Sequence, residues 1–263
     1  MDTPDVLQHN AIAWDRQCEN EGEWSRPVNA EVIANARRGD WQVILTPNKP
    51  VPMPWFGELQ GRDVLCLASG GGQQGPVLAA AGANVTVLDQ SPKQLDCDRL
   101  VATRESLDMR LIRGDMTDLS MLDDASFDIV FHPCSNCFTP NVRPVWNEAF
   151  RVLRPHGVLM AGFLNPLFFI FDNDRERGTL EVKHSLPYSD VARRESEGRD
   201  LSAEKGETME FGHLLTDQIG GQIDAGFLIS GFYEDYWSDE ATDLNKYTPT
   251  FIATLAIKPD KRH

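Results

Sequence analysis

The stretch from Asp63 to Gly75, DVLCLASGGGQQG, is the feature that most constrains how this chain can fold. An apolar run, Val64 to Ala68, stops abruptly at consecutive glycines, as a buried strand does when it enters a tight turn. The alanine- and leucine-rich stretch Gln73 to Gly82 follows, with Pro76 early enough for a first helical turn, and NVTVLD then ends at Asp89. The sequence therefore predicts a strand, a glycine turn, a helix and a second strand that ends in an acid.

This unit indicates a site for a cofactor that contains a nucleoside. Glycines let the backbone approach a ligand closely, and the free amides at the start of a helix bind electron-rich or anionic groups. Asp89, at the carboxyl end of the second strand, can accept hydrogen bonds from both hydroxyls of a ribose. Gly70, Gly72 and Gly75 also satisfy G-x-G-x-x-G, with an acid ~20 residues further on, so the spacing alone fits NAD equally well.

Composition limits the partners. With 263 residues, 41% of them hydrophobic, the chain is long enough for one large domain, which we favour over two small ones. Its formal net charge of -15 opposes a nucleic-acid partner, because binding to phosphates relies on clustered Lys and Arg. The cysteines are odd in number and Cys66 lies within the first strand, which favours a reducing compartment. With no signal-like segment and no apolar run near the ~20 residues of a membrane span, we expect a cytoplasmic protein that acts on small, neutral or cationic substrates.

Residues 1–60 precede the first core strand and hold most of the tryptophans of the chain. We expect amphipathic helices at His9–Cys18 and Glu31–Arg38. Two interpretations of this helical extension stay open. Either its tryptophans pack it onto the main domain, or Trp14 and Trp24 belong to a flap over cofactor and substrate. The tryptophans of the segment are Trp14, Trp24, Trp41 and Trp55.

Beyond Asp89, predicted strands and helices alternate. A helix begins at Ser91 and Pro92, which have the residue types of a cap and a first helical position. This order predicts an α/β fold with a mostly parallel sheet, helices on both faces, and a ligand site at the carboxyl ends of the strands. The later elements are a strand at the start of MRLIRGDMTDLS, a strand at Phe127–Phe131, a helix at Pro144–Leu153 and a strand at Val158–Phe163. The glycine turn, Asp89, Asp115 with Met116, and the loop His132–Cys137 should then converge on one edge.

Five blocks together, VLCLASGGG, VTVLD, GDM, SFDIVFH and RVLRPHGVLMAGF, resemble the class I S-adenosylmethionine-dependent methyltransferases. Within that family the chain most resembles the small-molecule branch, with motifs similar to those of the ubiquinone-biosynthesis C-methylases. The resemblance is good over residues 60–165 and looser after them. The resemblance implies a methyltransferase domain over residues 61–263. It also implies a Rossmann-like seven-stranded sheet, mostly parallel with an antiparallel last strand, whose final two strands would be Phe227–Tyr233 and Pro249–Lys258.

The resemblance further implies the cofactor, S-adenosyl-L-methionine, with S-adenosyl-L-homocysteine as its product. Asp89 would bind the ribose hydroxyls, Asp115 would reach the adenine amino group with Met116 against the ring, and His132 would lie beside the methionine moiety. The cofactor-binding residues implied in this way are Ala68, Ser69, Gly70, Gly72, Gln73, Asp89, Gln90, Asp115, Met116 and His132.

Two departures from the family pattern leave other readings open. Cys66 stands where an acid is frequent, and Ala68 with Ser69 stands where Gly-Cys is usual. These changes permit a protein that binds S-adenosylmethionine in a regulatory role without catalysis. An NAD-dependent oxidoreductase is a weaker alternative, because no tyrosine of the chain starts the Tyr-x-x-x-Lys pair of the short-chain dehydrogenases.

Methyl transfer from a sulfonium is an in-line displacement, to which an enzyme mainly contributes proximity and alignment. A base is needed only for a protonated acceptor. His132, after the fourth strand, and His213, in EFGHLL, are the two candidates, although either can instead be a hydrogen-bonding or capping group. The candidate contacts to a small-molecule acceptor are Trp14, Trp24, Asn136, Phe163 and Tyr188.

Two further segments carry alternatives. Cys134 and Cys137 form C-x-x-C, which can bind a soft metal or cycle as a redox pair, but we favour two unpaired loop thiols and expect no metal. Asp172–Thr208 mixes acids and bases and is either a solvated face or a cap over the acceptor, inserted at residues 165–210. The sequence leaves the oligomeric state open.

Overall fold

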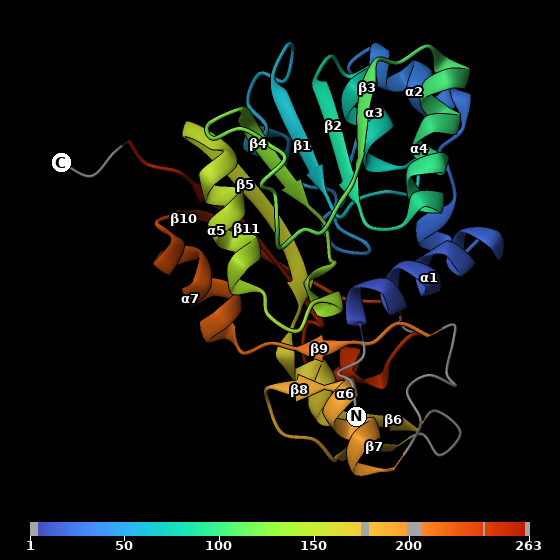
Figure 1. Ribbon diagram of the computed structural model, residues 1–263, viewed down its shortest axis with the longest axis vertical. Helices are drawn as coiled ribbons and strands as arrows, with labels where there is room; N and C mark the ends of the chain where they lie inside the picture. Colours follow the sequence, from blue (N-terminus) through green and yellow to red (C-terminus); the bar gives the residue numbers. More distant parts are fainter. Residues whose placement is uncertain (1–4, 175–178, 199–206, 239, 261–263) are drawn as a thin grey trace.

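The computed structural model describes residues 5–174, 179–198, 207–238 and 240–260 (Figure 1). The strands of its main sheet are β1 (Asp63–Leu67), β2 (Asn84–Asp89), β3 (Met109–Arg113), β4 (Phe127–His132), β5 (Leu153–Leu164), β10 (Leu228–Asp235) and β11 (Phe251–Ile257). They form a seven-stranded sheet in the order β10-β11-β5-β4-β1-β2-β3. β11 runs antiparallel to both of its neighbours, and the remaining pairs are parallel. The predicted sheet, with its antiparallel last strand, is confirmed.

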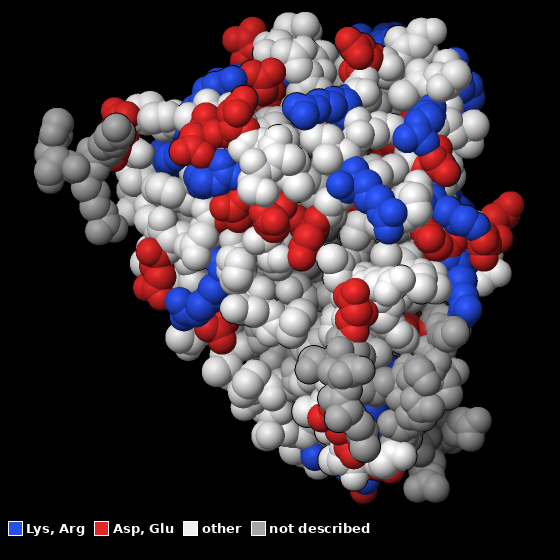
Figure 2. All heavy atoms as spheres, viewed as in Figure 1, with Lys and Arg blue, Asp and Glu red and all other residues white. Residues whose placement is uncertain are grey.

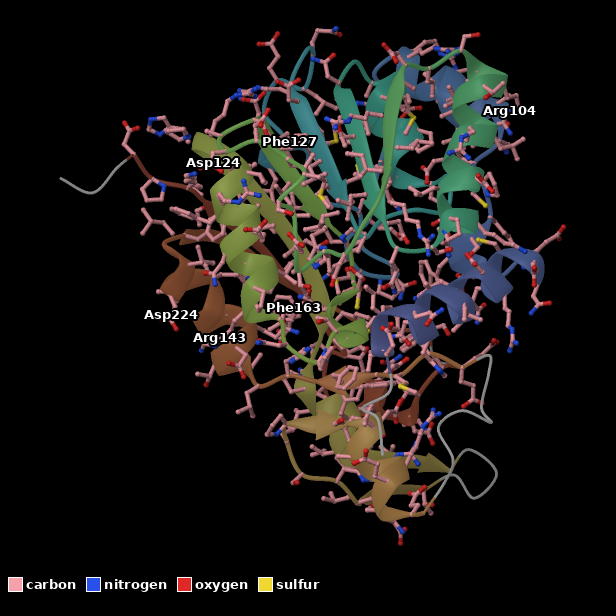
Figure 3. The ribbon with its side chains drawn as sticks, in the orientation of Figure 1. Arg104, Asp124, Phe127, Arg143, Phe163 and Asp224 are labelled. Carbon is pink, nitrogen blue, oxygen red and sulfur yellow. The ribbon has the colours of Figure 1, made fainter. Side chains whose placement is uncertain are left out.

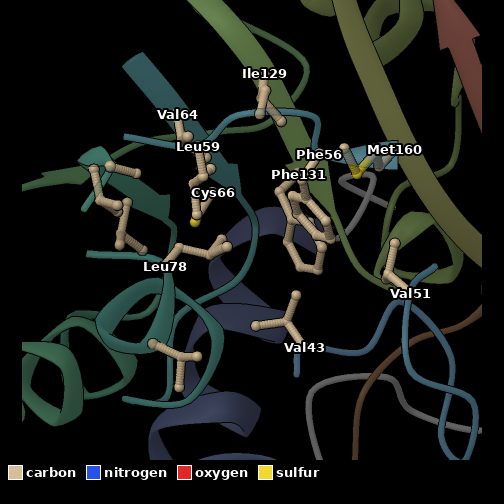
Figure 4. Packing of buried hydrophobic residues seen from close by; sticks show 14 of the residues in the cluster. Val43, Val51, Phe56, Leu59, Val64, Cys66, Leu78, Ile129, Phe131 and Met160 are labelled. Atoms are coloured by element: carbon tan, nitrogen blue, oxygen red, sulfur yellow. The ribbon is translucent and has the colours of Figure 1, made fainter. Parts of the chain in front are cut away.

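Helices cover both faces of this sheet (Figure 1). The helices are α1 (Val6–Glu19), α2 (Ala30–Arg37), α3 (Gln74–Ala80), α4 (Pro92–Glu105), α5 (Arg143–Val152), α6 (Asp190–Ser196) and α7 (Leu215–Ala225). α2, α3 and α4 contribute to the core on one face, whereas α5 contributes to the core on the other, where α7 packs against it. The alternation along β1 produces this division, because successive side chains of a strand point to opposite faces. Val64 and Cys66 join the first core, shown in Figure 4, and Leu65 and Leu67 join the second.

Local sequence signals set the bounds of these elements. The Ser91 hydroxyl accepts the amide of Gln94 at 3.1 Å and Pro92 opens α4, so the predicted N-terminal cap of this helix is present.

On the other face of the sheet, two ion pairs connect α5 to α7. The guanidinium of Arg143 donates to Asp217 at 2.7 Å and to Asp224 at 2.8 Å (Figure 3).

The N-terminal segment is docked against the sheet domain at two places. Asp15 of α1 accepts the Ser91 hydroxyl at 2.6 Å and the Lys93 amide at 3.2 Å, so α1 lies at the start of α4. Further along, the buried carboxylate of Asp235, at the end of β10, accepts the hydroxyl of Thr46 at 2.8 Å and two backbone amides of the same loop. The segment is therefore held by a carboxylate at each end.

An insertion separates β5 from α7 and lies at the bottom of Figure 1. It holds a hairpin of β6 (Phe171–Asp174) and β7 (Thr179–Val182), α6, and a short pair of β8 (Tyr188–Ser189) with β9 (Phe211–Gly212). The range predicted for the cap, 165–210, spans β6, β7, β8 and α6 and stops before β9, and its residues 175–178 and 199–206 lie outside the described part of the chain.

Charged side chains of both signs alternate over the face shown in Figure 2. The excess of acidic side chains therefore does not form a single patch on that face. Among the helices of the described residues, none is long and apolar enough to cross a membrane.

Candidate functional site

A cavity of about 450 Å³ opens at the carboxyl ends of the parallel strands. One part, the cofactor end, is formed by Ala68–Gly70 after β1, by Asp89 and Gln90 at the end of β2, and by Asp115 and Met116 after β3. The other part, the apolar end, lies across β4 in the sheet order, toward β5 and β11. The large apolar side chains that line this end include Val6, Leu7, Ile44, Leu45, Phe138, Leu164, Trp237 and Phe251.

The glycine turn brings the backbone close to the cofactor end. Ala68 has φ +47°, and Gly71 has φ +109°, a left-handed conformation that favours glycine. A Cβ added at Gly70 would lie 2.7 Å from the Gln94 Cβ and 3.0 Å from a carboxylate oxygen of Asp89. No side chain larger than hydrogen therefore fits at Gly70.

Asp89 is fixed by the backbone around it. One carboxylate oxygen accepts the Gly70 amide at 3.0 Å and the other accepts the Ser91 amide at 2.9 Å. Burial raises the pKa of Asp89, and these backbone amides lower it again. Each oxygen keeps a second lone pair, so the carboxylate is oriented and still able to accept ribose hydroxyls.

Polar atoms without partners mark the ligand side of the turn. The Ser69 hydroxyl and the Gln94 side-chain oxygen have no hydrogen-bond partner among the described residues, yet both residues line the cavity. Buried polar groups are almost always satisfied, so these atoms fit a polar ligand. Together with the Asp89 carboxylate, they suit the amino-acid and ribose parts of S-adenosylmethionine.

A buried acid that the sequence analysis missed supports the turn from below. Asp98 of α4 is fully buried, and one of its oxygens accepts the Gly71 amide at 3.1 Å. Burial raises the pKa of Asp98 well above its usual range, and the Asp98 charge contributes to the raised pKa of Cys66. Cys66 stands in β1 where an acid is frequent in the family, and Asp98 provides a carboxyl group at this turn from α4 instead.

The structure brings most of the predicted site residues to the cavity. Those that line it are Trp14, Trp24, Ala68, Ser69, Gly70, Gln73, Asp89, Gln90, Asp115 and Met116. Trp14 packs edge-on against Phe138 with 5.2 Å between ring centroids, so α1 forms part of the wall. The Asp115 carboxylate accepts the amide and the hydroxyl of Thr117 at 2.9 and 2.7 Å.

Other predicted residues lie behind the cavity wall, and His132 is the clearest case. It is fully buried, with Nδ1 2.9 Å from the Leu67 carbonyl oxygen and Nε2 2.6 Å from the side chain of Asn136. Burial lowers the pKa of His132, which favours the neutral ring. Asn136 in turn donates to the side chain of Gln218 at 2.9 Å. His132 and Asn136 therefore connect β1, β4 and α7.

The remaining predicted residues are also engaged within the protein. His213, two residues before α7, donates to the Asn136 carbonyl at 3.0 Å, and burial lowers its pKa. The Tyr188 hydroxyl donates to Asp190 at 2.6 Å, and burial raises its pKa. Phe163 is 1% exposed within β5 (Figure 3). Gly72, with φ +71°, packs against the backbone of α4, and like the other residues of this paragraph it is not among the residues that line the cavity.

Four of the five thiols form two pairs, and the fifth, Cys66, is buried in β1. Cys134 and Cys137 both line the cavity, and a hydrogen bond with Cys134 raises the pKa of Cys137 well above its usual range. In the described part of the chain, no group of three or more His, Cys, Asp or Glu side chains is arranged to hold a metal ion. Cys18 of α1 and Cys97 of α4 lie 3.9 Å apart at sulfur, a proximity that the sequence analysis did not anticipate.

Glu210 is a second residue that the sequence analysis missed. It lies between Met209 and Phe211 in an apolar run and lines the cavity near Cys137. An acid inside such a run, MEFG, was the available signal, because a carboxylate is costly to bury without a purpose.

Fold and site define the class of the protein. The chain belongs to the class I S-adenosylmethionine-dependent methyltransferases, and its cofactor is S-adenosylmethionine. The family described as a methyltransferase domain matches residues 65–161. Within the class, the chain is 50% identical over 254 residues to the "Uncharacterized methyltransferase YbaJ" of Bacillus subtilis, covering 96% of this chain and 98% of that protein.

More distant relatives agree with this assignment. The chain is 28% identical over 159 residues to the "Ubiquinone biosynthesis O-methyltransferase" of Bordetella avium, covering 54% of this chain and 65% of that protein. A crystal structure of an S-adenosylmethionine-dependent methyltransferase from Mesorhizobium loti shares the fold, with a TM-score of 0.60 at 18% identity over 78% of this chain and 94% of that one. The likeness to the Mesorhizobium loti structure shows a shared fold.

Proposed function

We propose that this methyltransferase acts on a small-molecule acceptor that binds in the apolar end of the cavity. The observation that carries the proposal is the continuity of the cavity, which reaches from Asp89 and Asp115 to Leu164 and Phe251. Once a nucleoside cofactor occupies the polar cofactor end, the side chains around the remaining space are mostly apolar, with a few polar groups among them. A concave site with apolar walls and few polar groups is typical for small molecules.

Two segments close the apolar end in this proposal. The N-terminal segment, residues 1–60, contributes Val6, Leu7 and Trp14 to the wall, which supports its role as a flap. The insertion at 165–210 contributes Glu210, and its residue Phe169 packs with Leu164 and Phe251, which supports its role as a cap. Both segments would exclude water and hold the acceptor against the strand ends.

The reaction requires alignment more than acid–base chemistry. S-Adenosylmethionine supplies an electrophilic methyl on a sulfonium when it is bound. Asp89 would orient the ribose and the glycine turn would position the amino-acid part, while the wall of Trp14 and Phe138 would limit how the acceptor can lie. Holding the reacting atoms in line can provide much of the acceleration, with effective molarities of about 10⁵ to 10⁸ M.

We also propose that the protein is located in the cytoplasm, a reducing compartment. The cysteines of the chain are all free, including Cys18 and Cys97, whose sulfur atoms lie 3.9 Å apart. In an oxidising compartment two thiols so placed would be expected to form a disulfide.

The proposal is tested by following the methyl group. The purified protein is incubated with S-[methyl-¹³C]adenosylmethionine and a cell extract that has been split into small molecules and macromolecules, with Asp89→Ala as the inactive control. We expect the label in the small-molecule fraction, with the wild-type protein only. Label that enters protein or nucleic acid instead would refute a small-molecule acceptor. Calorimetry with S-adenosylhomocysteine and NADH checks the cofactor separately.

A further inference from the structure

The charged side chains of the cavity wall are all acids. Among the described residues that line the cavity there is no Lys, Arg or His, and the acids are Asp89, Asp115 and Glu210. Asp89 and Asp115 belong to the cofactor end, where backbone amides bind both carboxylates. Glu210 is the remaining acid, and the proposed binding of the cofactor gives it no role.

Glu210 lies at the apolar end beside the loop that follows β4. It directly precedes β9, which packs against the short helix Asn136–Phe138 in that loop, and its charge acts on Cys137. β4 is paired with β1, whose end carries the glycine turn, so this loop adjoins the region expected to hold the methionine part of the cofactor. Glu210 therefore lies on the side of the cavity where an acceptor would meet the methyl group.

The backbone at Glu210 is fixed by hydrogen bonds, whereas its carboxyl group accepts only a weak one. The Glu210 amide donates to the Asp190 carboxylate at 2.9 Å, and the preceding Met209 amide donates to Asn10 at 2.7 Å. The Glu210 carboxylate accepts only a long bond, 3.4 Å, from the Thr208 hydroxyl among the hydrogen bonds of the described residues. A carboxylate needs several donors, so this group has free capacity to accept a bond from a ligand.

The surroundings also keep Glu210 able to exchange a proton. Burial, and next the charge of Asp190, raise the pKa of Glu210 to about 7. Asp190 itself is bonded to Tyr188 and to Arg193, with Arg194 3.9 Å away, and the thiols of Cys134 and Cys137 face the same space. The raised pKa of Cys137 keeps that thiol protonated, and His132 and His213 do not line the cavity.

We propose that Glu210 binds the nucleophile of the acceptor through a hydrogen that the nucleophile carries, so that the acceptor is an apolar amine or hydroxyl compound without an anionic group. This inference rests on the proposed function. In the transfer, a lone pair of the neutral amine nitrogen or of the hydroxyl oxygen forms the bond to the methyl carbon, and the sulfur–methyl bond breaks with its electron pair left on sulfur. A proton of that nitrogen or oxygen passes to an oxygen of the ionised Glu210 carboxylate and from there to water.

The test uses three probes of similar shape and different charge: phenethylamine, 4-ethylphenol and 3-phenylpropanoate. Their affinities for the full chain saturated with S-adenosylhomocysteine are measured by ligand-observed NMR, for wild type, Glu210→Gln and the control Glu195→Gln. Glu195 is an exposed acid of α6 that does not line the cavity, so its replacement changes the net charge equally. In parallel, [¹³C-carboxyl]glutamate labelling follows the Glu210 resonance against pH.

We expect phenethylamine and 4-ethylphenol to bind wild type at least tenfold more tightly than 3-phenylpropanoate, and Glu210→Gln to remove this preference while Glu195→Gln keeps it. The Glu210 resonance should titrate close to neutral pH, and phenethylamine should lower its midpoint. If S-adenosylhomocysteine binds but neither the amine nor the phenol moves the Glu210 resonance, Glu210 does not bind the acceptor and the proposed function stands. If S-adenosylhomocysteine fails to bind wild type, the proposed function itself is wrong.

Discussion

The two ends of the cavity are built in different ways. The cofactor end consists of the ends of three adjacent strands, β1, β2 and β3, and its contacts are made by backbone amides and short polar side chains. The apolar end collects side chains from α1, from the loop around Leu45, from the loop after β4 and from residues beyond β5. The first depends on the fold of one contiguous stretch, whereas the second depends on how segments more than 200 residues apart, Val6 and Glu210, come together.

This difference suggests that the residues of the cofactor end are constrained by the shared cofactor, and those of the apolar end by the identity of the acceptor. A cofactor shared by a whole class of enzymes is bound at the carboxyl ends of the strands, where the sheet topology places the residues that contact it. An acceptor that differs from one enzyme to the next is bound by loops and insertions, which tolerate change without loss of the core. Variants at the two ends should therefore affect different ligands.

The largest effect is expected at Asp89. Asp89→Ala removes the group that would bind the ribose hydroxyls, and each hydrogen bond to a charged group contributes about 1.5–3 kcal/mol. We expect the affinity for S-adenosylhomocysteine to fall about 1000-fold in calorimetry, and less for Asp89→Asn, which keeps one oxygen for the Gly70 amide. Glu210→Gln is the matched change at the other end and should leave this affinity unaltered. An equal loss in both variants would show that the two ends are not separate.

A second prediction concerns α1, the helix of the proposed flap. The Cys18 and Cys97 sulfur atoms are 3.9 Å apart and need to approach to about 2.05 Å to form a disulfide, which would fasten α1 to α4. Treatment with diamide, which takes up the two thiol hydrogens, should form this bond and stabilise the fold by about 2–4 kcal/mol, or roughly 5–10 °C in melting temperature. Release of S-adenosylhomocysteine should become slower. Cys97→Ser provides the control, and a wild-type protein that diamide leaves fully reduced would contradict the geometry.

The sequence predicted these two ends unequally, for physical reasons. The sheet and the positions of Ala68, Asp89, Asp115 and Met116 follow from local patterns, because strand ends that are consecutive in the chain meet at one edge. The role of Asp98 was not predictable from Cys66, since the compensating carboxyl comes from a different element and reaches the turn only in three dimensions. Long-range packing likewise decides the apolar end.

The histidines illustrate the same limit. A histidine at the end of a strand beside the cofactor is a reasonable candidate base, and His132 is indeed the last residue of β4. Its ring, however, is turned away to Leu67 and Asn136, a choice that depends on the neighbouring strand and on α7. Which way a side chain points is not encoded in its spacing, so the sequence located the loop and not the group that faces the cavity.

A smaller effect is expected from Trp14, which tests the flap. Trp14→Ala removes the edge-on contact with Phe138 and opens one wall of the cavity. We expect about a tenfold loss of affinity for 4-ethylphenol and a smaller loss for S-adenosylhomocysteine, because an aromatic pair contributes about 0.5–1.5 kcal/mol beyond the area it buries. Ile12→Ala, on the exposed side of the same helix, should change neither affinity. If both variants behave alike, α1 stabilises the fold without shaping the site.

The smallest effect follows from the proton on Glu210. Since burial and Asp190 raise its pKa to about 7 in the folded protein, folding favours the protonated acid. The resulting contribution to stability is complete below the pKa of the unfolded chain, about 4.3, and is lost as the pH rises through 7. Glu210→Gln has no such proton, so its melting temperature relative to wild type should rise by about 2–4 °C between pH 6 and pH 7, where the contribution changes by about 1 kcal/mol. Glu195→Gln should show no such trend. A difference that stays constant with pH would mean that Glu210 is charged throughout, and would leave the apolar end with a permanent anion that selects cationic amines over hydroxyl compounds.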